Sequence, residues 1–146
     1  MRGAVEHFLK SIRNEIPMND PKEPLSETDM PENEARYRIC QTDSIRPVPC
    51  SCGSSRRAFT DDPDRVASLH IVETDGDARS HYHRQTTEIY YFLEGSGQME
   101  LDGQLCEVRP GTAILIKPGC RHRAIGNLTF LNLPVPAFDP ADEWFD

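Results

Sequence analysis

The residues of this chain best suited to chemistry are two histidines separated by one residue, His81 and His83. In an extended strand, side chains two residues apart point to the same face, and these two would lie roughly 6.6 Å apart along the backbone. After a short polar turn at 84–87, Glu88 opens a second run of strand-forming residues, which can place its carboxylate beside both imidazoles. We therefore expect these three side chains to converge on one metal ion.

A fourth donor is expected from His122, which follows an apolar strand at 112–116 and a Pro-Gly turn. A bare His-x-His pair often binds nothing, but the addition of Glu88 and His122 favours a metal site. Imidazole and carboxylate groups bind a divalent transition metal, and Fe, Mn, Ni, Zn, Co and Cu all accept them. The predicted metal ligands are His81, His83, Glu88 and His122.

The spacing of these residues resembles the paired motifs of the cupin superfamily. The first motif is His-x-His, four residues, Glu, six residues and Gly; the second is Gly, seven residues, Gly, two residues and His. The resemblance covers residues 66–135 and departs by one position at Gly76, Pro118 and Asn127, none of which is a ligand. It implies an all-β fold, the double-stranded β-helix (jelly-roll or cupin barrel), with the metal inside and Fe as the first expectation.

The same resemblance implies a reaction class. We expect a dioxygenase-type oxidoreductase that acts on a small anionic or aromatic substrate. Two alternatives remain open: a metal-dependent isomerase or lyase acting on a sugar or organic acid, and a cupin that binds a small molecule without turning it over. Dependence on dioxygen separates the first two.

Several arginines lie near the motifs, and the planar fork of an arginine matches a carboxylate. Arg79 has the strand parity of the histidine pair and would point inward if the strand begins that early, and Arg57 is the second candidate. Tyr90 and Phe92 share the parity of Glu88, so they are expected inside the barrel, either as core or as the apolar wall of a pocket. These four residues are the predicted substrate contacts.

The chain has five cysteines, and this odd number shows no framework typical of secreted proteins, so reduced thiols are expected. Cys50-Ser51-Cys52 is too short for the usual zinc-ribbon pair, which has two intervening residues. Cys120 either lines the pocket or fills the barrel wall as a small apolar residue.

A chain of 146 residues suits one compact core, and its net charge of −8 comes from acidic residues in 1–34 and 139–146. The middle of the chain is neutral, which argues against a nucleic acid as partner and leaves a small-molecule substrate. We expect an N-terminal helix and acidic arm at 1–35, the barrel at 36–138, and an acidic tail at 139–146. The segment after Pro134 can fold back over the barrel.

Short strands separated by turn residues are typical of a barrel or sandwich. They are expected at 66–73, 88–93, 97–101, 104–108, 112–116 and 128–133, with Asp102-Gly103 as a two-residue hairpin turn. Apolar residues at helical spacing in 4–16 predict a short amphipathic helix, whose apolar stripe suits the barrel or a second subunit of a homodimer. No apolar stretch of about 18 residues and no secretory signal is present, so a cytoplasmic protein without membrane contact is expected.

Overall fold

The structure is a computed structural model that describes residues 36–145. The chain divides into two units, 1–37 and 38–146, and all strands described below belong to the second. The helix expected at 4–16 and the arm that follows it lie outside the described residues. Among the described residues, no helix has the length and apolar character needed to cross a membrane.

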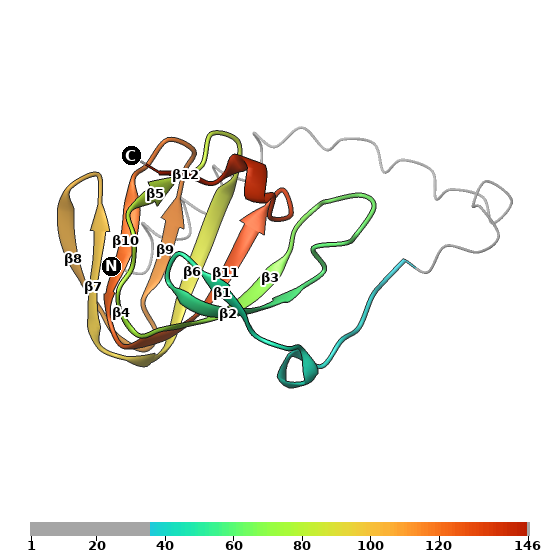
Figure 1. Ribbon diagram of the computed structural model, residues 1–146, viewed down its shortest axis with the longest axis horizontal. Coiled ribbons are helices and arrows are strands. Elements are labelled where there is room, and N and C mark those ends of the chain that lie inside the picture. Colours follow the sequence, from blue (N-terminus) through green and yellow to red (C-terminus); the bar gives the residue numbers. More distant parts are fainter. Residues whose placement is uncertain (1–35, 146) are drawn as a thin grey trace, which may run out of the picture. The chain divides into compact units, whose positions relative to one another are not determined.

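Two antiparallel sheets make up the fold (Figure 1). The first has the order β1 (Val48–Cys50), β2 (Gly53–Ala58), β3 (Leu69–Thr74), β11 (Leu128–Val135), β6 (Thr87–Gly95) and β9 (Ala113–Ile116). The second has the order β12 (Trp144–Phe145), β5 (His81–Tyr82), β10 (His122–Gly126), β7 (Gly97–Leu101) and β8 (Gln104–Val108), and β4 (Gly76–Asp77) also pairs with β10. Two short 3-10 helices, η2 (Thr42–Ser44) and η3 (Pro140–Asp142), complete the described elements. The predicted all-β, double-stranded β-helix is confirmed.

Strand boundaries follow the local sequence where apolar and polar residues alternate. β7 and β8 have the predicted bounds, and Asp102 and Gly103 between them both have positive φ (49° and 81°), as the favoured two-residue hairpin turn requires. The strand predicted at 66–73 begins only at Leu69. β1 and β2 were not predicted, because β1 has only three residues and the polar, serine- and arginine-rich sequence of β2 lacks an apolar alternation.

The inward faces of the central strands are apolar at one end and polar at the other. The inward residues are Glu88, Tyr90 and Phe92 on β6, Leu128, Phe130 and Asn132 on β11, and His70, Val72 and Thr74 on β3. Strand register places Asn132 beside both His70 and Tyr90, and Phe130 beside Phe92. The ring of Phe130 stacks on Tyr90 with centroids 4.6 Å apart. The polar end therefore rests on a packed aromatic core.

Candidate metal centre

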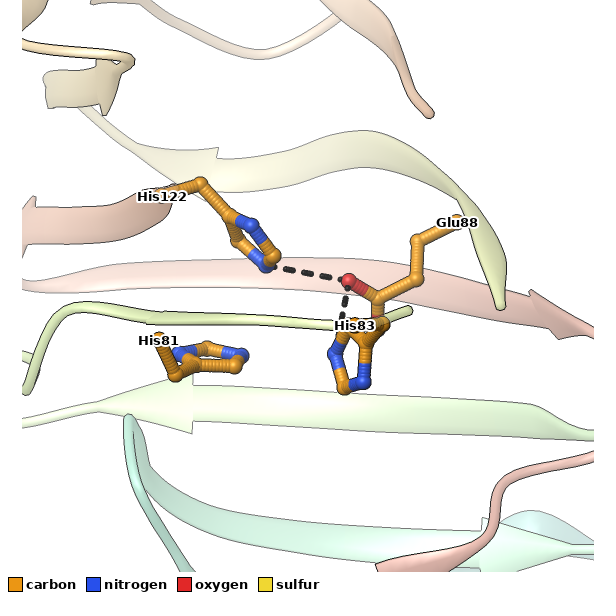
Figure 2. Close-up of side chains that lie close together, drawn as sticks. All are labelled: His81, His83, Glu88 and His122. Atoms are coloured by element: carbon orange, nitrogen blue, oxygen red, sulfur yellow. Dashed lines mark ion pairs between the residues drawn. The ribbon is translucent and has the colours of Figure 1, made fainter. Parts of the chain in front are cut away.

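The four predicted ligands come together at the polar end of the barrel. His81 begins β5 and pairs across the sheet with His122, the first residue of β10. His83 directly follows β5, and Glu88 reaches the same point from β6 in the other sheet. One potential ligand atom from each residue lies within 4.8 Å of the others, and Figure 2 shows His83 and His122 turned toward Glu88 with His81 beside them.

All four side chains are buried, with 1–4% of their surface exposed. Glu88 Oε2 lies 3.0 Å from His122 Nε2 and 3.3 Å from His83 Nε2. These are ion-pair distances without hydrogen-bond geometry, so the three atoms have no hydrogen-bond partner within residues 36–145. A buried polar atom without a partner costs about 1–3 kcal/mol. A divalent cation would satisfy all three atoms, and the donor set therefore fits such an ion.

Backbone carbonyls orient each imidazole. The Nδ1 atoms of His81, His83 and His122 lie 3.2, 2.9 and 3.0 Å from the carbonyl oxygens of Arg79, Asp142 and Cys120, respectively. Because a carbonyl can only accept, Nδ1 is the protonated nitrogen of each neutral imidazole, and Nε2 is the nitrogen left to bind a metal. The lone pair of Nε2 is available as a ligand when that nitrogen carries no proton.

Glu88 is held as an anion in this buried position. Burial opposes its ionisation, but the adjacent His122 and His83 hold its pKa below the usual range. Asn132 Nδ2 donates a hydrogen bond of 2.7 Å to Oε1, which leaves Oε2 for an ion. Burial, followed by the charge of His122, lowers the pKa of His81 to about 4, so His81 is neutral at pH 7.

The C-terminal segment completes the site, and sequence reasoning did not identify its two contributing residues. β12 pairs with β5, so the tail folds back over the barrel as expected (Figure 1). The carboxylate of Asp142 accepts hydrogen bonds from the backbone N–H groups of Arg84, Gln85 and Thr86 and from the Thr86 hydroxyl. Its backbone carbonyl is the one that orients His83. Asp142 thus fixes both a ligand and the turn between His83 and Glu88.

Glu143 is the second unpredicted residue. Its Oε1 accepts a 2.8 Å hydrogen bond from the Ser51 hydroxyl and lies 3.9 Å from His81 Nε2. Acidic residues in a C-terminal tail are usually exposed to solvent. Only the pairing of β12 with β5 places Asp142 and Glu143 at the site.

A cavity of about 30 Å³ adjoins three of the four ligands, His81, His83 and Glu88. Its wall also includes Arg57, His70, Tyr90, Asn132 and Phe138. Two of the predicted substrate contacts, Arg57 and Tyr90, therefore face the cavity.

The other two predicted substrate contacts lie elsewhere. Phe92 is fully buried in the aromatic core and does not line the cavity. Arg79 is exposed, and its guanidinium lies 4.1 Å from the centroid of the Phe145 ring. The parity expected for Arg79 does not apply, because β5 begins only at His81.

Arg57 and His70 are two polar side chains of the cavity wall that can still form interactions. Arg57 Nε donates to Ser55 Oγ (2.8 Å) and its guanidinium lies 4.5 Å from the centroid of the Phe138 ring, while its terminal nitrogens have no ion pair among the described residues. His70 Nε2 is 3.1 Å from Ser68 Oγ, and Nδ1 has no hydrogen bond within residues 36–145. Burial, followed by the charge of Arg57, lowers the pKa of His70 to about 4, so this imidazole is neutral.

His70 is not among the residues that the sequence analysis assigns to the site. The structure places it in the cavity wall with 3% of its surface exposed. Strand parity alone could not find it, since nothing in the local sequence shows which face of β3 points inward.

Comparisons with known proteins agree with this architecture. The sequence profile of the family described as "Cupin domain" matches residues 68–129. A crystal structure of a protein from Planctomyces limnophilus is 39% identical, with a TM-score of 0.70, covering 76% of this chain and 98% of that one. At that identity and coverage, the likeness extends across nearly the whole of the other protein.

More distant similarities show the fold. Pac13 from Streptomyces, a nucleoside dehydratase, has a TM-score of 0.65 at 15% identity, covering 77% of this chain and 95% of that one.

An uncharacterized protein from Methanocaldococcus jannaschii is 42% identical over 60 residues, which is 40% of this chain. The chain spans about half the length of that relative, 48%.

We predict that the purified chain binds one divalent transition-metal ion. His83→Ala and Glu88→Ala should each lower the affinity at least about 100-fold, because each removes a ligand and leaves the remaining buried donors less well satisfied. Metal content after dialysis and competition with a chelator measure the affinity. His70→Gln, in the same cavity but outside the four-residue cluster, should retain full stoichiometry. Equal metal loss in all three variants would contradict this assignment.

Asp142→Asn should weaken metal binding about 10–100-fold, because the turn beside His83 loses its anchor. It should also lower the free energy of unfolding of the metal-free chain by about 1–3 kcal/mol, since an amide cannot accept all the hydrogen bonds of the carboxylate. The donors of the turn, acting against burial, lower the pKa of Asp142 from its ordinary 3.8. Its contribution is therefore present at neutral pH and fades as the pH falls below that value.

Asp139→Asn is the matched control, because its side chain caps η3 by accepting from the Ala141 N–H, which asparagine also does. Urea denaturation and chelator competition, applied to both variants, measure the two effects. A loss of metal affinity in Asp139→Asn equal to that in Asp142→Asn would refute a specific role for Asp142.

Proposed function

Because this chain belongs to the cupin superfamily, we propose that it is a metal-dependent enzyme of the dioxygenase type that acts on a small carboxylate. The observation that carries the proposal is the buried set of Nε2 and Oε2 atoms without hydrogen-bond partners, each oriented by its own second contact. Such a set is suited to holding an ion tightly and in one geometry.

The charge of the site favours an anionic substrate. Three neutral imidazoles and one carboxylate around a divalent ion leave a net charge of about +1. A bound iron(II) ion would supply two open coordination positions and the electrons that dioxygen chemistry needs.

Arg57 supports the proposal that the substrate is bound through a carboxylate group. Its guanidinium lines the cavity, its plane is held by Ser55 and Phe138, and its terminal nitrogens have no ion pair among the described residues. A planar fork held in this way can donate two parallel hydrogen bonds to a carboxylate. The proposed substrate thus reaches from Arg57 to the metal.

Tyr90 and Phe138 form a further part of the cavity wall. The hydroxyl of Tyr90 makes no hydrogen bond within the described residues, and burial raises its pKa, so it stays protonated. It can donate a hydrogen bond to a bound substrate. Phe138 gives an apolar surface that suits an aromatic or aliphatic body behind the carboxylate.

A second candidate is a metal-dependent lyase or isomerase. It is favoured by His70, a neutral imidazole in the cavity wall whose Nδ1 is free to exchange a proton with a substrate. The fold is compatible with this chemistry, since Pac13 eliminates water from a nucleoside. Such a reaction would proceed without dioxygen.

Oxygen uptake distinguishes the two candidates. The chain loaded with iron(II) should consume dioxygen in the presence of at least one compound from a panel of small aromatic and 1,3-dicarbonyl carboxylates, and His83→Ala should abolish uptake. Product formation in an anaerobic chamber would instead favour the lyase or isomerase. Retention of every compound unchanged, with Fe, Mn, Ni, Zn, Co or Cu bound, would reject both and favour a binding protein without turnover.

Arg57→Gln should raise KM for the carboxylate substrate at least about 10-fold with a smaller change in kcat, because it removes a bidentate contact distant from the reacting group. Arg56→Gln is the matched control, since Arg56 pairs with Glu73 at 2.6 Å and does not line the cavity. Steady-state kinetics of both variants measure the effect. Equal KM values in Arg57→Gln and the parent chain would remove Arg57 from the substrate site.

A further inference from the structure

The hairpin between β1 and β2 brings two cysteines to the cavity. Cys50 ends β1 and pairs with Gly53, so Ser51 and Cys52 form the turn. Gly53 has φ +137°, and a side chain there would collide with the backbone carbonyl of Glu73 on β3. This close approach holds the turn against the neighbouring strand, and both Cys50 and Cys52 line the cavity.

The two thiols differ in accessibility. Cys52 is buried in the core with 7% of its surface exposed, whereas Cys50 is half-buried. Residues two apart in a tight turn fall within the Cα separation of about 4.4–6.8 Å that a disulfide spans. One thiol is therefore reachable by a small molecule, and the second lies next to it.

Their electrostatic surroundings differ as well. The neighbouring Cys52 thiol lowers the pKa of Cys50 to about 6 against the effect of burial, and the positive charge of Arg57 acts in the same direction. The contact with Cys50, together with burial, raises the pKa of Cys52. At neutral pH the pair thus consists of a thiolate beside a thiol, the arrangement typical of a reactive cysteine and its resolving partner.

The other three cysteines lack this arrangement. Cys40 and Cys106 are exposed, and Cys120 is half-buried and packs against the core without lining the cavity. They provide internal references for the reactivity of the pair.

We propose that Cys50 and Cys52 form a reversible thiol–disulfide pair, oxidised by hydroperoxides, in the wall of the cavity. The Cys50 sulfur attacks the outer oxygen of the hydroperoxide, the O–O bond breaks, and an alkoxide leaves and takes up a proton. This yields a sulfenic acid on Cys50. The Cys52 sulfur then attacks the Cys50 sulfur, the S–S bond forms, and the hydroxyl leaves as water with the thiol proton. The two thiols lose two electrons, and the hydroperoxide is reduced to an alcohol and water.

The experiment uses the reduced 146-residue chain after removal of metal with a chelator, so its result does not depend on the proposed enzymatic function. The chain is treated with one equivalent of tert-butyl hydroperoxide, the remaining thiols are alkylated at intervals, and peptides are identified by mass spectrometry. Cys50 and Cys52 should lose alkylation together, at least about 10-fold faster than Cys106, with a mass lower by two hydrogens. Dithiothreitol should restore both thiols.

Two variants locate the steps. Cys52→Ser should accumulate a sulfenic acid on Cys50 that dimedone traps, and Cys50→Ser should leave Cys52 reduced. Oxidation of Cys50 at the rate of Cys106 would overturn the proposal, as would conversion to sulfinic acid without an intramolecular disulfide. Because the rates are compared within the parent chain, the result stands even if a variant fails to fold.

Discussion

The burial of the Glu88 carboxylate among three imidazoles is the constraint on which the rest of the structure depends. An ionised carboxylate inside a protein is tolerated only where its oxygens have partners. Asn132 donates a hydrogen bond to one oxygen, while the other oxygen lies at ion-pair distance from His83 and His122 and is left for a cation. This arrangement brings β6, β10, β11 and the segment after β5 to one point. The aromatic core beneath them, with Phe130 stacked on Tyr90, keeps that point in place.

The orientation of the histidines depends on backbone groups more than on side chains. Each Nδ1 faces a carbonyl, and two of these carbonyls belong to Arg79 and Cys120, which lie two residues before the histidines they orient. The third belongs to Asp142, 59 residues away from His83. The C-terminal segment is therefore part of the site, since its side chain and its backbone act on the same turn.

The two sheets contribute different chemistry to the cavity. The second sheet and the segment that follows β5 supply His81 and His83, while β2 and β3 of the first sheet supply Arg57 and His70, and β1 and the turn after it supply the two thiols. β6 lies between these contributions and carries both Glu88 and Tyr90.

The sequence by itself determined the four-residue cluster, the all-β class and most of the central strands. His-x-His at strand parity, a glutamate after a tight turn and a histidine after Pro-Gly are local signals, because strand alternation and turn chemistry act over a few residues. Tertiary structure alone decided which residues surround that cluster. The Arg79 side chain does not point inward as the strand alternation predicts, because β5 starts only at His81. His70, Asp142 and Glu143 lie at the site because strand pairings join distant parts of the chain. Such pairings depend on long-range register, which no local pattern contains.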